Sequence, residues 1–149
     1  MIKRKGFTLV EIMIVVAIIA LLAAIAIPNL LRARLQANES VAQAALKTIA
    51  TAEISWRAAN ATYGSLANLS AATPPYIDGV LGTGTKNGYT FATVAPDANV
   101  FTSTAVPQNA NQSGVRSFCV TEDGVVRVQA AGGAIADHAA CVALPSSSA

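Results

Sequence analysis

The chain has 149 residues, of which 53% are hydrophobic and 12% are charged. This length allows one domain of ordinary size with an extension, and the composition is too apolar for a disordered chain. Lys3, Arg4 and Lys5 supply three of the ten basic residues, so the rest of the chain has seven basic side chains against eight acidic ones. Composition therefore does not indicate a basic surface for nucleic acid.

The first 31 residues have the composition of a membrane-spanning segment. After the basic cluster, Glu11 is the one ionisable side chain among the 25 residues from Phe7 to Leu31. As a helix, this stretch would span about 35 to 40 Å, which is enough to cross a bilayer. The positive-inside bias places the basic end in the cytoplasm and everything after Leu31 outside it. A carboxylate in hydrocarbon costs roughly 2.5 kcal/mol or more, so Glu11 is expected to have a specific role.

Two ordinary explanations of this segment are a cleaved secretory signal peptide and a generic signal anchor. Ala24-Ile25-Ala26 offers an A-x-A cleavage pattern for the first. However, the apolar region is longer than that of a signal peptide, and neither explanation accounts for an acid near its start.

The order of residues at the N-terminus resembles the class III signal of type IV pilins and of the pseudopilins of type II secretion. The resemblance rests on the basic leader, on Gly6 and Phe7, on Thr8-Leu9-Val10-Glu11 and on the unbroken apolar run that follows. It continues with Pro28, at a position where pilin helices characteristically carry a proline. It is strong over residues 1 to about 35 and only architectural beyond them.

The resemblance implies a maturation step and an assembly step. A prepilin peptidase would cut between Gly6 and Phe7 and N-methylate the new Phe7 amine. Glu11 would then neutralise the N-terminal amine of the adjoining subunit, and Thr8 would support that site by hydrogen bonding. A buried acid is tolerated in lipid when it meets a positive partner, and the first helical turn also favours negative charge. A snorkelling acid without a partner is the alternative.

Pro28 removes one backbone hydrogen bond and is expected to kink or locally open the helix. In filaments of this family the segment before the proline can be extended, and the sequence leaves both states open.

Beyond Pro28 the pattern becomes amphipathic. Two rows of residues spaced seven apart describe one face of a helix that continues to about residue 60: Leu35, Ala42, Ile49 and Trp56, and Asn38, Ala45, Ala52 and Ala59. Small alanines on this face favour packing against a sheet over a coiled coil. Four polar residues lie off these rows, namely Glu39, Gln43, Lys47 and Arg57.

The second half of the chain predicts an antiparallel sheet. Residues 61–87 are rich in Gly, Pro, Ser and Thr and are expected to form a loop, in which Tyr63, Leu66 and Leu69 could make a short helical turn. Four strands are expected at 88–94, 100–106, 115–121 and 125–129, with a hairpin at Asp123-Gly124. Residues 130–149 would form a tail. The predicted fold is α+β: a long N-terminal helix, half membrane-spanning and half amphipathic, packed on a four-stranded antiparallel sheet, as in the pilin roll.

The expected domains are a leader at 1–6, a transmembrane and assembly half of the helix at 7–31, and a periplasmic or extracellular globular domain at 32–149. Cys119 and Cys141 are the two cysteines, and the globular domain would meet an oxidising compartment. The resemblance implies a disulfide between them that brackets a C-terminal surface loop used for contacts. Two unrelated thiols remain the alternative.

The sequence predicts neither an enzyme nor a cofactor or metal site. The G-x-G of Gly82 and Gly84 has no preceding strand, Asp137-His138 is a weak metal pair, and Asp123 remains an open candidate for calcium. The Asn60-Ala-Thr62 sequon could accept a glycan, but chance occurrence is the better explanation in a chain rich in Asn, Ser and Thr.

Three functional readings follow. The first is a type IV pilus subunit that serves adhesion, motility or DNA uptake. Its expected partners are its own copies, the prepilin peptidase, the inner-membrane assembly platform with its ATPase, and the inner membrane before assembly. The second is a type II secretion pseudopilin acting as a periplasmic piston, which the cysteine pair disfavours. The third is a membrane-anchored binding domain that never polymerises, which Gly6-Phe7 and Glu11 disfavour.

Overall fold

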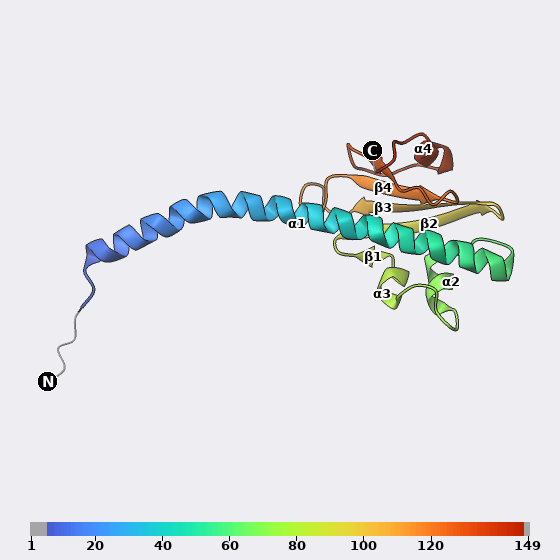
Figure 1. The fold of residues 1–149 in the computed structure, drawn as a ribbon, viewed down its shortest axis with the longest axis horizontal. Helices are drawn as coiled ribbons and strands as arrows, with labels where there is room; N and C mark the ends of the chain where they lie inside the picture. Colours follow the sequence, from blue (N-terminus) through green and yellow to red (C-terminus); the bar gives the residue numbers. More distant parts are fainter. Residues whose placement is uncertain (1–5, 148–149) are drawn as a thin grey trace. The chain divides into compact units, whose positions relative to one another are not determined.

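The computed structural model describes residues 6–147, which form two compact units, one ending at Arg34 and the other beginning at Leu35. The helix α1 (Leu9–Asn60) contributes residues to both units (Figure 1). It contains no glycine and continues through Pro28. It ends where Ala61 adopts a left-handed conformation with φ of 61° and donates its N–H to the Arg57 carbonyl. This geometry is a common way for a helix to stop, because it satisfies one of the last free carbonyls.

The sheet in the second unit is a simple antiparallel meander with the order β1-β2-β3-β4-β5. Its strands are β1 (Thr85–Lys86), β2 (Tyr89–Asp97), β3 (Val100–Pro107), β4 (Ser117–Thr121) and β5 (Arg127–Gln129). The α+β fold and the pairing of the two strands around Asp123-Gly124 are confirmed. The predicted count of four strands is wrong, because the two-residue strand β1 pairs with the start of β2 across the Asn87-Gly88 turn.

The segment 61–87 is more regular than the sequence suggested. It holds α2 (Leu66–Ala71) and α3 (Gly79–Gly82), each capped by a side chain, because Ser65 accepts from the Asn68 N–H and Asp78 accepts from the Leu81 N–H. Leu66, Leu69 and Leu81 are buried, so these short helices are held by their apolar contacts. A further short helix, α4 (His138–Val142), lies near β3 and β4 in the C-terminal segment.

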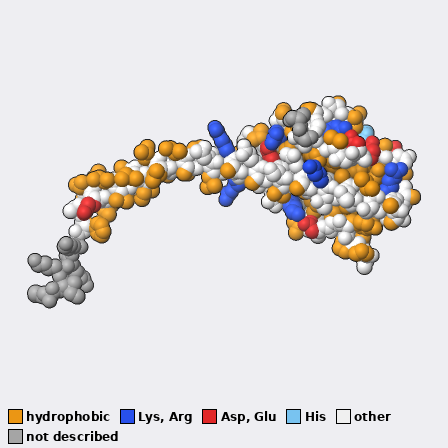
Figure 2. Space-filling model, in the orientation of Figure 1, with side chains coloured by type: hydrophobic (Ala, Val, Ile, Leu, Met, Phe, Trp, Pro, Cys, Tyr) orange, Lys and Arg blue, Asp and Glu red, His pale blue; other side chains and the backbone are white. Residues whose placement is uncertain are grey.

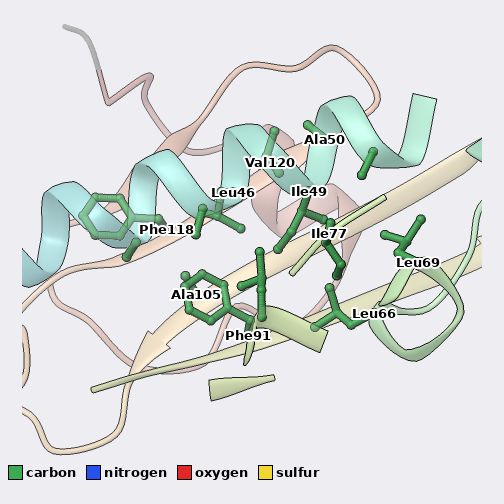
Figure 3. Packing of buried hydrophobic residues seen from close by; sticks show 14 of the residues in the cluster. Leu46, Ile49, Ala50, Leu66, Leu69, Ile77, Phe91, Ala105, Phe118 and Val120 are labelled. Atoms are coloured by element: carbon green, nitrogen blue, oxygen red, sulfur yellow. The ribbon is translucent and has the colours of Figure 1, made fainter. Parts of the chain in front are cut away.

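The core lies between one face of the sheet and α1. Figure 3 shows Leu46 and Ile49 of α1 close to Phe118 and Val120, with Leu66, Leu69 and Ile77 near the same cluster. The predicted helix face is largely buried, at Ala42, Ala45, Ile49 and Ala52, whereas Ala59 is exposed. The buried residues of α1 also include Leu46, Ala50, Glu39 and Glu53, so the buried face is wider than the two predicted rows.

Replacing Leu46 with alanine should destabilise the second unit. This side chain is fully buried, and a Leu→Ala change in such a site costs about 2–5 kcal/mol because it leaves a cavity. The neighbouring Lys47→Ala variant is the matched control, since Lys47 is exposed. Unfolding of the full chain in detergent can be followed by the fluorescence of Trp56, the single tryptophan. Equal stability of the two variants would contradict this core.

Candidate functional site

The first site lies at the start of α1, where the structure brings Thr8 and Glu11 together. The Thr8 backbone N–H donates to Glu11 Oε2 at 2.8 Å, and the Thr8 hydroxyl donates to the same oxygen at 2.7 Å. In return, the Glu11 N–H donates to Thr8 Oγ1 at 3.3 Å. These reciprocal bonds form a capping box, which satisfies otherwise free N–H groups of the first turn. Among the described residues, no hydrogen bond is made to Glu11 Oε1.

Gly6 and Phe7 precede this cap and are exposed. A Cβ placed on Gly6 would meet nothing within 4 Å, so no contact within the described chain requires glycine there. The basic cluster Lys3-Arg4-Lys5 lies outside the described residues.

The most hydrophobic window of α1 is not buried by any described residue. This window covers 18 residues and has a mean hydropathy of 3.0. The helix is thus long and apolar enough to cross a membrane, by length and composition. Figure 2 shows hydrophobic side chains along this stretch, with an acidic group near its start.

The second site is the C-terminal region, where the structure joins Cys119 of β4 to Cys141 of α4 by a disulfide. Both cysteines are fully buried. Asp137 caps α4 by accepting from the Ala140 N–H at 2.8 Å. His138 lies between two neighbours, with Nδ1 at 3.1 Å from Thr102 Oγ1 and Nε2 at 3.4 Å from Glu122 Oε1. The segment closed by the disulfide is therefore tied to β3.

The acids considered for metal binding have protein partners instead. The bonds from Arg127 are the main cause that lowers the pKa of Asp123 to about 2, and the Thr121 hydroxyl and the Val125 N–H also donate to it. Asp137 is used as a helix cap. Within residues 6–147, no cluster of three or more His, Cys, Asp or Glu is placed to hold a metal ion.

Sequence reasoning missed two buried carboxylates on α1. Glu39, with 5% of its surface exposed, accepts from the Arg116 guanidinium at 2.7 and 2.8 Å. It also accepts from the backbone N–H groups of Val115 and Arg116, both at 3.1 Å. Burial alone would raise the pKa of Glu39, but these donors outweigh it, so its pKa lies below the ordinary value. The Glu39–Arg116 pair fastens α1 to the chain that leads into β4. No signal in the sequence could have predicted this pair, because the spacing between Glu39 and Arg116 follows no local pattern.

Glu53 is the second missed carboxylate, and it is fully buried. Its Oε2 accepts from the Gly64 N–H at 2.9 Å, while Oε1 has no hydrogen-bond partner among the described residues. Burial raises the pKa of Glu53, and the bond from Gly64 only partly opposes that effect.

The comparisons with known proteins agree with the class of protein that this architecture defines, a pilin-like protein with an apolar helical extension. A family model described as a prokaryotic N-terminal methylation motif matches residues 1–27. The chain belongs to the type IV pilins, because the family model described as "Type IV minor pilin ComP, DNA uptake sequence receptor" matches residues 30–121, more than half of it.

Individual relatives are named as type IV pilus proteins or as a type II secretion protein. The chain is 36% identical over 121 residues to the type IV major pilin protein PilA of Myxococcus xanthus, covering 81% of this chain and 50% of the relative. It is 48% identical over 63 residues to the type IV wide pilus major component PilA4 of Thermus thermophilus, covering 42% and 48%. It is also 40% identical over 63 residues to the type II secretion system core protein G of Pseudomonas aeruginosa, covering 42% and 44%. The chain thus spans half or less of the length of these relatives.

The pH dependence of stability should reveal Glu53. Because its folded-state pKa is raised, its contribution to the free energy of unfolding is present below the ordinary value of 4.5 and is lost as the pH rises through the raised pKa. Wild-type protein should therefore lose stability relative to Glu53→Gln as the pH rises above the ordinary value of 4.5, until Glu53 is ionised in the folded state.

The Glu39→Gln variant is the control, because its stability relative to wild type should change with pH in the opposite direction. The lowered pKa of Glu39 stabilises the fold above its unfolded value, and this stabilisation is lost as the pH falls through the folded value. Trp56 fluorescence of the full chain in detergent measures both variants. A wild-type to Glu53→Gln difference that does not change with pH would show that Glu53 is not buried as described.

Proposed function

We propose that this chain is a structural subunit of a type IV pilus, polymerised through the apolar half of α1. The observation that carries the proposal is the N-terminal site: Glu11, held by Thr8, stands at the head of an apolar helix that its own chain leaves uncovered. Lipid can cover such a helix before assembly, and the apolar helices of other copies can cover it afterwards. The expected locations are the inner membrane for the unprocessed chain and an extracellular filament on the cell surface after assembly.

Maturation prepares the site for assembly. A prepilin peptidase cuts between Gly6 and Phe7 and N-methylates the new amine. The positive amine of Phe7 from one copy then pairs with the Glu11 carboxylate of the next. The capping box supports this role, because Thr8 holds Glu11 through Oε2, and no described residue donates to Oε1, which can accept from an incoming donor. Thr8 thus acts as a positioning residue for Glu11.

Pro28 allows the same helix to open locally. A proline inside a helix removes one backbone hydrogen bond, so α1 is expected to open most easily in the turns before Pro28. We infer that this segment can open in the filament and close again in the membrane. An inner-membrane platform and an ATPase would drive the transfer between these two states. The resulting filament would serve adhesion, motility or DNA uptake.

A type II secretion pseudopilin is the alternative, supported by the similarity to core protein G over 63 residues. The resemblance to pseudopilins implies an acidic calcium site near the C-terminus, but Arg127 engages Asp123, and no cluster of acids among the described residues is placed to hold a metal ion. The Cys119–Cys141 disulfide separately favours the pilus subunit.

The family description also raises the question of a DNA receptor. DNA affinity depends on lysine and arginine side chains that can neutralise phosphates. Residues 35–147 contain five such side chains against seven acidic ones. Three are paired with acids, Lys86 with Asp78, Arg116 with Glu39 and Arg127 with Asp123. On the face seen in Figure 2, basic groups in this unit are scattered among other side chains. These charges favour a structural role over DNA recognition by this unit.

Replacing Gly6 with leucine should block maturation. The site around Gly6 is open, so the larger side chain leaves the described structure unchanged and interferes only with a peptidase that needs a small residue before the cut. Mass spectrometry of membrane protein should find the full-length chain in Gly6→Leu cells and a chain starting at methylated Phe7 in wild-type and Gly6→Ala cells. Normal processing of Gly6→Leu would contradict the peptidase assignment.

Changes at Glu11 and Thr8 should impair assembly but not processing. Glu11→Gln keeps the shape and removes the charge that pairs with the amine, so sheared filaments should be lost while Phe7 is still exposed and methylated. Thr8→Val removes a hydrogen bond to a charged group, worth about 1.5–3 kcal/mol, and should reduce filament yield roughly tenfold. Thr8→Ser retains the hydroxyl and serves as the control. Normal filament yield from Glu11→Gln would exclude the assembly role.

A further inference from the structure

The apolar stretch of α1 ends abruptly at two arginines, Arg32 and Arg34. Leu30 and Leu31 are 65% and 56% exposed, and the next exposed large hydrophobic side chain along the chain is Ile54. Arg32 and Arg34 are themselves exposed, and neither makes a hydrogen bond or an ion pair with any described residue. These two residues, which we call the arginine pair, therefore stand where the lipid-compatible surface stops, and no described residue neutralises them.

The arginine pair reaches both sides of the helix at nearly one level. Residues two positions apart in an α-helix lie about 200° apart around its axis and differ in height by about 3 Å. Figure 2 shows basic groups on both sides of the helix where the hydrophobic stretch ends. A protein that packs against a helix covers one face of it, whereas a layer of lipid headgroups surrounds a helix at one level. The geometry of the arginine pair fits the lipid layer.

We propose that the arginine pair binds phosphate groups of phospholipids on the outer face of the inner membrane. A guanidinium group is planar and can donate two parallel hydrogen bonds to phosphate oxygens. Its apolar stem can lie along hydrocarbon while the charged end reaches the headgroups. The basic leader sets the orientation of the chain, so two cations at the outer end are compatible with the positive-inside bias. The inference rests on the membrane location of the unassembled chain in the proposed function.

The distance from the arginine pair to Glu11 indicates what this binding achieves. Along the helix, Glu11 and Arg32 are about 32 Å apart, at about 1.5 Å per residue. The hydrocarbon core of a bilayer is roughly 30 Å thick. When Arg32 is held at the outer phosphates, Glu11 and its bond from Thr8 therefore lie at the headgroups of the cytoplasmic face. The arginine pair thus keeps the acid out of hydrocarbon until the subunit is withdrawn for assembly.

Carboxylates of another copy are the other candidate partner, and the structure disfavours them. Of the seven acidic side chains in residues 35–147, three are paired with basic side chains of the same chain and Glu53 is fully buried. Asp97 and Asp137 accept backbone N–H groups. Glu122 Oε1 lies 3.4 Å from His138 Nε2. Each acid of the second unit is thus buried or in contact within its own chain, whereas lipid phosphates surround the arginine pair in the membrane.

Solid-state NMR of the full chain in vesicles tests the contact directly. The guanidinium carbons of the six arginines are labelled with carbon-13, and the chain is reconstituted in phosphatidylethanolamine and phosphatidylglycerol. Lipid phosphorus attenuates the signal of any guanidinium carbon that lies close to it. Changing both Arg32→Gln and Arg34→Gln should reduce the attenuated signal by about two of the six arginines.

Arg57→Gln is the matched control for this measurement. Arg57 contacts Tyr63 and Asn99 in the second unit, so its removal should leave the attenuated signal at the wild-type level. An equal attenuated signal from wild type and from the Arg32→Gln/Arg34→Gln variant would overturn the proposal. Pairing of the two arginines with carboxylates of another copy would give that result.

A spin label at position 33 tests the consequence for depth. The two native cysteines are bonded to each other, so Ala33→Cys provides the only free thiol. In vesicles, a nitroxide there should lie at the headgroups and be accessible to a water-soluble nickel complex. Adding Arg32→Leu and Arg34→Leu should move it into hydrocarbon by about 5 Å, one helical turn. Adding Gln36→Leu and Ala37→Leu instead introduces leucine outside the pair and should leave the depth unchanged. Equal depth with and without the arginines would overturn the proposal.

Neither measurement requires filaments, so failure of the inference can be distinguished from failure of the proposed function. A chain that forms no filaments in cells but shows phosphate contact in vesicles would contradict the proposed function and support the inference. A chain that does not float with the vesicles would contradict the membrane location, and the inference with it.

Discussion

The constraint on which the structure depends is an apolar helical segment that no described part of the chain covers. In the most hydrophobic window of α1 no residue is buried, so this part of the molecule is compatible only with lipid or with other apolar surfaces. A single carboxylate at the head of such a segment is costly unless it is held and then paired. The bonds from Thr8 hold Glu11 at one oxygen. Under the proposed function, the amine of a neighbouring copy supplies the pair.

The remainder of α1 meets a different requirement, because it packs against the sheet of the second unit. Ala42, Ala45 and Ala52 allow the helix to lie close to the strands. Two buried carboxylates then fix its position at separate points. Glu39 binds Arg116 before β4, and Glu53 binds the Gly64 N–H after the helix ends. Glu39 is satisfied by charged and backbone donors. In the part of the chain that the structure describes, one oxygen of Glu53 has no hydrogen-bond partner, and burial raises the pKa of this carboxyl.

Much of this organisation could be predicted from the sequence, because long periodic segments and fixed motifs are local signals. The long helix, the α+β class and the hairpin at Asp123-Gly124 are examples. The errors have a common cause in tertiary contacts. The burial of Glu39 was not predicted, because nothing in its local sequence indicates an arginine 77 positions away. The helices α2 and α3 lie in a segment rich in breakers and are stabilised by buried leucines, although their caps, Ser65 and Asp78, were visible signals.

The central claim is that the processed chain polymerises through its N-terminal site. The most direct measurement is to shear intact cells, image the released material by cryo-electron microscopy, and determine the N-terminus of its protein by mass spectrometry. The account predicts long surface filaments built from a chain that begins at N-methylated Phe7, with the apolar half of α1 enclosed by other copies. Processed and methylated chain that remains in the cell envelope, with no filament in the sheared fraction, would contradict it.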